Sequence, residues 1–160
     1  MQKRISNEIK VLLYIGNIDE LSGVLHKNEC NTIMQYSYEA IRNRDNMGFP
    51  RGDSSSLILE LTIRNFSHVL SRHFLKELRS NRPYDYTFLF NAIFDDNKIL
   101  SKYDNRLTAK GYIIELEEAF GKQQEGDLMS GQKIMKAKLL ISKLIYHGEN
   151  NNSVLSVSND

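Results

Sequence analysis

Three long segments of alternating side chains most constrain the fold of this chain. Tyr84–Asp95, Arg106–Glu118 and Lys133–Tyr146 each alternate with the two-residue period of a β-strand. Strands in globular proteins are usually about five or six residues long, whereas these would reach roughly 40 Å at about 3.3 Å per residue. Strands of that length in a chain of 160 residues need a sheet that curls or closes on itself.

The remaining segments predict shorter strands and one helix. The shorter strands are expected at Glu8–Ile15, Leu21–Leu25, Thr32–Ile41, Ser56–Arg64 and Val154–Val157, and a flexible loop at Gly121–Gly131. Between His68 and Arg79, Leu70, Phe74 and Leu78 recur at four-residue spacing, which predicts an amphipathic helix of about three turns. The predicted fold is therefore mainly β: a compact β-barrel or sandwich of long antiparallel strands with one flanking α-helix.

Several of these strands are apolar on both faces. In Lys133–Tyr146 one face carries Met135, Ala137, Leu139, Ile141 and Ile145, and the other carries Ile134, Leu140, Leu144 and Tyr146. A sheet with a core on one side only does not need this pattern. We therefore expect part of the outer surface to be buried as well, by the helix or by a neighbouring subunit.

Composition limits the size, the partners and the compartment. A chain of 160 residues is most simply one domain, with residues 1–7 as an N-terminal extension and 148–160 as a polar C-terminal tail. The net charge of +1 argues against binding nucleic acid or an anionic membrane. Cys30 is the sole cysteine, which excludes an intrachain disulfide. No apolar run resembles a signal peptide or a membrane span, so we expect a cytoplasmic protein that leaves the cell only through a dedicated machine.

A search for catalytic chemistry finds no coherent site. The chain lacks a phosphate-binding glycine loop and a nucleophile motif around serine. His68 and His73 are five residues apart, so on a helix they point about 140° away from each other. Glu115 and Glu117 share a strand face, which fits a solvated strand end. We therefore predict no enzyme activity, no metal and no cofactor.

The most distinctive local feature is a polar loop with an apolar tip between two alternating strands. It contains Asp45, Gly48, Phe49, Pro50, Arg51, Gly52 and Asp53. An exposed loop of this kind indicates contact with another protein more than chemistry. Acidic residues interleave with its arginines, which disfavours a nucleic-acid patch, and the tripeptide Arg51-Gly52-Asp53 is too short to indicate adhesion.

Several motifs along the chain resemble one protein family. They are Tyr36-Ser37-Tyr38, Asp45, Gly48-Phe49-Pro50-Arg51-Gly52, the strand LILELTIR, and the stretches 86–91, 109–113 and 117–120. Their order, from about residue 8 to 147, resembles the tube protein of type VI secretion systems, the hemolysin-coregulated protein (Hcp) family. The resemblance is strongest to the branch found in Bacteroidetes, called TssD.

That resemblance implies a fold and a function. The family folds as a compact β-barrel with a flanking helix, related to phage tail-tube proteins. Six copies form a ring, rings stack into a tube, and a contractile sheath propels the tube into a target cell with effectors in the lumen or on the spike. The resemblance makes Asp45 and Gly48–Asp53 a contact element between subunits. A second interpretation stays open, in which the aromatic row Tyr84–Phe94 lines a barrel that binds a small apolar ligand.

Overall fold

The computed structural model describes residues 11–18, 24–64, 66–92, 94–96, 98–99, 106–121, 132–147 and 152–156. Its strands are β1 (Val11–Ile15), β2 (Cys30–Arg44), β3 (Pro50–Arg64), β4 (Tyr84–Phe90), β5 (Phe94–Asp95), β6 (Lys98–Ile99), β7 (Arg106–Gly121), β8 (Gln132–His147) and β9 (Asn152–Ser156). A short 3-10 turn, η2 (Lys27–Glu29), precedes β2, and the α-helix α1 spans His68–Glu77.

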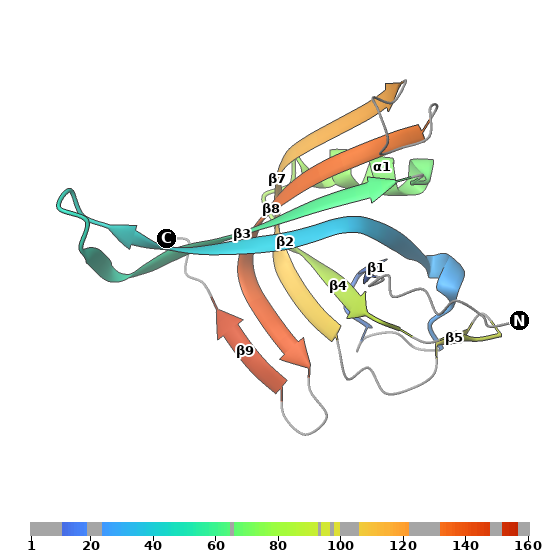
Figure 1. Ribbon diagram of the computed structural model, residues 1–160, viewed down its shortest axis with the longest axis horizontal. Helices are drawn as coiled ribbons and strands as arrows, with labels where there is room; N and C mark the ends of the chain where they lie inside the picture. The colour runs from blue at the N-terminus through green and yellow to red at the C-terminus, as the bar shows by residue number, and fades with distance from the viewer. Residues whose placement is uncertain are drawn as a thin grey trace, which may run out of the picture.

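Six antiparallel strands close into a barrel. The strand order β3-β2-β1-β4-β7-β8 is closed by a further pairing of β3 with β8, and β9 is added along the end of β8. Figure 1 shows the strands curving around a common centre. The small hairpin of β5 and β6 forms a separate sheet. The mainly β barrel with one flanking helix that the sequence predicts is thus confirmed.

Three β-bulges let the long strands curve, and a fourth shift in pairing lies between Arg42 and Arg44 of β2. Shifts in strand pairing leave Met34 in β2, Ile114 in β7 and Ser142 in β8 as the extra residue opposite the partner strand. A bulge bends its strand and increases the local twist, so strands of this length can wrap into a closed sheet.

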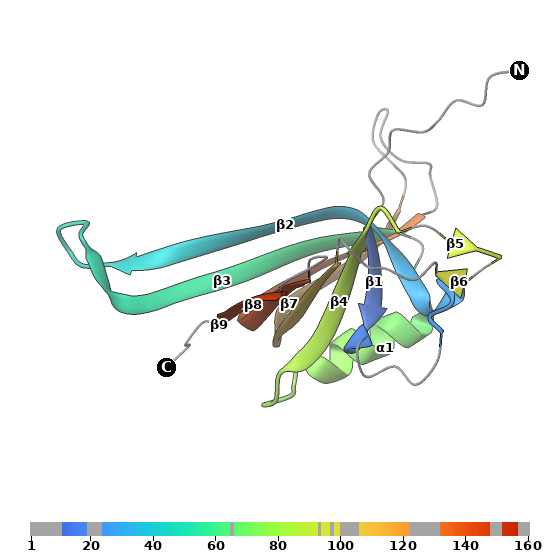
Figure 2. The same cartoon turned by 90° about the horizontal axis from the view of Figure 1, so that it is seen from below.

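Inward-facing side chains and one face of the helix form the main core. The fully buried members include Leu13, Leu59, Leu61, Ile63, Phe74, Tyr86, Phe88, Leu107, Met135, Leu139 and Ile141. Ser67 caps the helix, because its hydroxyl accepts a hydrogen bond from the Leu70 amide at 3.3 Å. Leu70 and Phe74 then enter the same buried cluster as the strand residues, and Figure 2 shows α1 lying beside the barrel strands.

A second, smaller core covers the opposite face of β1 and β4. It joins Leu12 and Leu89 to Ile18 and Leu25 from the segment that follows β1. At β1 and β4 the second apolar face is thus covered by this segment of the same chain and not by the helix. In β8, for which two-sided burial was expected, Ile134 and Leu140 are half-buried and Tyr146 is exposed, so cover by a neighbouring subunit stays a prediction there.

Several predicted boundaries were wrong for identifiable reasons. Tyr84–Asp95 is not one strand, because Asn91 adopts a φ of 55° and ends the β4 ladder before the β5–β6 hairpin. Leu144 faces the core, contrary to the prediction, because the bulge at Ser142 reverses the alternation of β8. Val24 and Leu25 lie outside any strand, while residues 21–23 and 122–131 fall outside the described part of the chain.

The C-terminal segment contains the short closing strand that the sequence predicts. A strand expected at Val154–Val157 is present as β9 over Asn152–Ser156, inside the segment interpreted as a polar tail. It pairs with β8 from Lys143 to His147. The N-terminal extension, residues 1–7, lies outside the described residues.

Candidate subunit-contact surface

Two core strands continue beyond the barrel as a projecting arm. β2 pairs with β1 only from Cys30 to Ile33, and β3 pairs with β8 only from Ile58 to Arg64. Beyond these points the two strands pair with each other. Residues 37–57 are called the arm here: its root at Leu57 still lies in the core, and its distal part extends far from the barrel, as Figures 1 and 2 show from two directions.

Asp45 organises the tip of the arm. One of its carboxylate oxygens, Oδ1, accepts hydrogen bonds from the backbone amides of Met47 and Phe49, each at 2.9 Å. The Asp45 amide donates to the Phe49 carbonyl at 2.8 Å, and the Gly48 amide donates to the Asp45 carbonyl at 3.0 Å. Gly48 has a φ of +86°, which favours glycine over a residue with a Cβ. The tip is therefore a defined turn.

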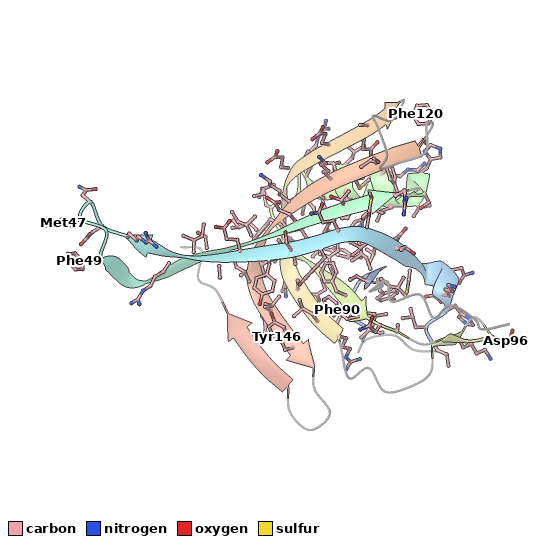
Figure 3. All side chains as sticks on the ribbon, in the orientation of Figure 1. Met47, Phe49, Phe90, Asp96, Phe120 and Tyr146 are labelled. Atoms are coloured by element: carbon pink, nitrogen blue, oxygen red, sulfur yellow. The ribbon has the colours of Figure 1, made fainter. Side chains whose placement is uncertain are left out.

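This turn presents two large apolar side chains to solvent. Met47 is 83% exposed, the highest value among the large apolar residues described, and Phe49 is 63% exposed. Both lie at the far end of the arm, as Figure 3 shows. Flexible Met and planar Phe side chains held apart from the main core are typical of a contact with another protein.

The structure divides the predicted loop into a tight turn and the beginning of a strand. Asp45, Gly48 and Phe49 belong to the turn, as expected. Pro50 is already paired with Arg44, so β3 begins earlier than predicted. Arg51, Gly52 and Asp53 lie in β3 where its pairing with β2 shifts, between Pro50 and Ser55. Sequence reasoning missed Met47, although an apolar residue beside a turn glycine is a usable signal.

The outer face of the barrel carries a ladder of charges. The Lys138 ammonium lies 3.5 Å from carboxylate oxygens of both Glu60 and Glu115, across β3, β8 and β7. Glu115, and then Glu60, raises the pKa of Lys138. The same shallow depression includes Glu117 and Lys136. Because these groups are well exposed, the pairs contribute little to stability. Glu115 and Glu117 lie on a solvated strand face as predicted, but not at a strand end, because β7 continues to Gly121.

The histidines of α1 and the Cys30 thiol are also candidate reactive groups, and His73 and Cys30 are partly buried. His73 is half-buried, with Nε2 3.0 Å from the Tyr86 hydroxyl and its ring 4.6 Å from that of Tyr84, whereas His68 is exposed. Burial raises the pKa of the Cys30 thiol to about 12, so it is not a ready nucleophile. In the part of the chain that the structure describes, no group of three or more His, Cys, Asp or Glu side chains is arranged to hold a metal.

The closed antiparallel barrel, its flanking helix and its projecting hairpin together form a tail-tube-like fold. No protein-family model matches the chain, and no curated protein matches it in sequence. Solved structures do match. One is the tail tube of SPP1, with a TM-score of 0.50, 10% identity, and coverage of 92% of this chain and 80% of that one.

Within that class the fold is that of Hcp. A crystal structure of an Hcp protein aligns with a TM-score of 0.65 and 10% identity, covering 96% of this chain and all of the other. Hcp1 from Flavobacterium johnsoniae aligns with a TM-score of 0.51 and 10% identity, covering 92% of this chain and 98% of its own. At such identities the similarity establishes the fold, which agrees with the family resemblance of the sequence motifs. No helix within the described ranges has the length and apolar character to cross a membrane.

Proposed function

We propose that this chain is a structural, non-enzymatic tube subunit of a type VI secretion system, or of a related contractile injection device. In this proposal six copies form a ring and the rings stack into a tube that carries or delivers effectors. The observation that carries the proposal is the Hcp fold over 96% of the chain, combined with an arm whose apolar tip has no partner within the described residues.

The arm is the proposed contact between subunits. Rings and stacks require heterologous contacts, in which a patch on one copy meets a different patch on the next. An arm that places Met47 and Phe49 far from their own barrel fits such a contact. Burying a large apolar side chain contributes about 1.5–3 kcal/mol, so two of them supply a useful share of a weak interface. Asp45 and Gly48 shape the turn, and 50–53 connect it to the barrel.

The other proposed partners follow from the same function. They are the sheath, the baseplate, the spike and effector cargo, with no role for nucleic acid or membrane insertion. A net charge of +1 supports this proposal, because like subunits of nearly zero charge stack without strong repulsion. The subunit would assemble in the cytoplasm and be secreted by the machine that it builds.

Native mass spectrometry and electron microscopy of the purified protein test the proposal. We expect rings of six, and stacked rings at higher concentration. The double variant Met47→Ser/Phe49→Ser should lose stacking while the monomer stays folded. Its matched control, Val69→Ser/Leu75→Ser, changes two apolar residues that are 76% and 53% exposed on α1 and should assemble normally. A strictly monomeric wild-type protein at high concentration would refute the tube function.

One observation weighs against the ligand-binding barrel. Tyr86 and Phe88 of the aromatic row are fully buried, and they pack against Phe74 and Tyr36, respectively. These rings fill the core, and this favours the tube subunit over a barrel that holds a small apolar ligand.

A further inference from the structure

The arm leaves the barrel where β3 separates from β8. The last pair between these strands is Ile58 with Leu140. β8 continues in its own direction and takes β9 as its next partner from Lys143 onward. Figure 1 shows the arm and the end of β8 diverging from this point. The backbone ladder between β3 and β8 therefore does not fix the angle of the arm.

Two tyrosines bridge this divergence. The Tyr146 hydroxyl, on the end of β8, donates a hydrogen bond of 2.6 Å to the hydroxyl of Tyr38, on the root of the arm. Tyr146 is paired with the core residue Leu107 in β7, and Tyr38 with the core residue Leu59 in β3. The bond thus connects the arm to a β8 residue far beyond the last β3–β8 pair.

An aromatic cluster holds the arm side of this bridge. The Tyr36 ring lies 5.1 Å from that of Phe88 and 5.3 Å from that of Phe90, and 6.4 Å from that of Tyr38. Edge-to-face contacts of this kind orient rings. The Tyr36 hydroxyl is buried and has no hydrogen-bond partner among the described residues. Tyr36 therefore anchors the strand through its ring, and the polar link to β8 is made by Tyr38.

We propose that the Tyr38–Tyr146 hydroxyl bridge is a clasp that fixes the angle of the arm relative to the barrel. Each subunit then presents its apolar tip in one orientation before it meets a neighbour. The value of the clasp for assembly rests on the proposed tube function, whereas its effect on the arm is a property of the single subunit. Tyr38 and Tyr146 act here as positioning residues, because neither is at the tip.

Spin-label distance measurements test the clasp directly. In a Cys30→Ser background, one label is placed at Met47→Cys on the tip and the other at Arg72→Cys on the exposed face of α1. We expect a narrow distance distribution in the parent, and a broader one in both Tyr146→Phe and Tyr38→Phe, which keep the rings and remove one hydroxyl. Tyr36→Phe is the matched control: it removes a neighbouring hydroxyl that takes no part in the bridge, and should leave the distribution narrow.

Hydrogen exchange of the unlabelled protein measures how much the arm is loosened when the Tyr38–Tyr146 bond is lost. Amides at the root of the arm should exchange about twofold faster in Tyr146→Phe, the factor that corresponds to about 0.5 kcal/mol, the lower end for a hydrogen bond, because Tyr38 and Tyr146 are 45% and 39% exposed. Unchanged distributions and unchanged exchange in both Tyr38 and Tyr146 variants would overturn the clasp. A loosened arm in subunits that still assemble normally would uphold the clasp as a property of the single subunit and refute its value for assembly.

Discussion

Gly111 of β7 lies close to the backbone of β8, and we expect Gly111→Ala to destabilise the barrel. A Cβ at this position would lie 2.5 Å from the Leu140 carbonyl oxygen, and 2.9 Å and 3.1 Å from atoms of Ile141. The nearest atom belongs to the backbone of β8, beside the bulge at Ser142, so it cannot rotate away. The bulge would have to open to admit the methyl group.

The expected magnitude follows from two opposing effects. Overpacking a core position usually costs about 1–3 kcal/mol, and a clash with backbone belongs at the upper end. Replacing a strand glycine with alanine recovers roughly 0.5–1 kcal/mol of conformational entropy. The net loss should be about 2 kcal/mol, which for a chain of this size lowers Tm by about 4–8 °C.

Urea denaturation of Gly111→Ala, compared with Gly48→Ala and Gly48→Asn, separates the effect of steric crowding on stability from the effect of an unfavourable φ. A Cβ added to Gly48 would meet no described atom within 4 Å, but the φ of this residue is +86°. Alanine there should therefore cost about 1 kcal/mol and asparagine less. The free energy of unfolding should fall most for Gly111→Ala, with an unchanged denaturant slope. If Gly111→Ala is as stable as the parent, the close approach of β7 and β8 does not constrain the barrel as argued.

Two further predictions concern buried polar groups. Tyr36→Phe should raise the free energy of unfolding by about 1 kcal/mol in urea denaturation, because it removes a buried hydroxyl that has no partner among the described residues; a loss of stability would contradict this. Burial lowers the pKa of His73, so the folded state favours the neutral ring and the unfolded chain binds more protons below its ordinary pKa of about 6.5. The free energy of unfolding should therefore fall as the pH drops below about 6.5. In His73→Gln this part of the pH dependence should be lost. A pH profile identical to that of the parent would show that His73 is not its source.

The sequence was sufficient for the architecture because the alternation of its strands is strong. Leu57, Leu59, Leu61 and Ile63 all face the core, as their period requires. The resemblance of the motifs to Hcp also led to the correct fold. The alternation of the sequence did not reveal the bulge at Ser142, because an extra residue in a strand can be recognised only when its pairing with the partner strand is known. Leu144 was misplaced for that reason.

The candidate surface was only partly predictable. The Gly48-Phe49 turn and the exposure of Phe49 follow from local composition. The length of the arm does not, since it depends on where β3 stops pairing with β8, and that is a property of the closed barrel. The Tyr38–Tyr146 bond joins residues 108 positions apart, and no local pattern indicates such a pair.

The continuity of β2 and β3 from barrel to arm has a mechanical consequence. In the proposed tube, a subunit that is driven forward would experience force at its contacts with neighbours. Because the arm consists of the same strands that contribute Ile33 and Leu61 to the core, a pull at its tip is carried along the strand axes into the β2–β3 and β3–β8 ladders. Those hydrogen bonds lie across the direction of pull and share the load in shear. The arm therefore leads directly into the barrel strands, and its β2–β3 ladder is interrupted at the shift in pairing between Arg42 and Arg44.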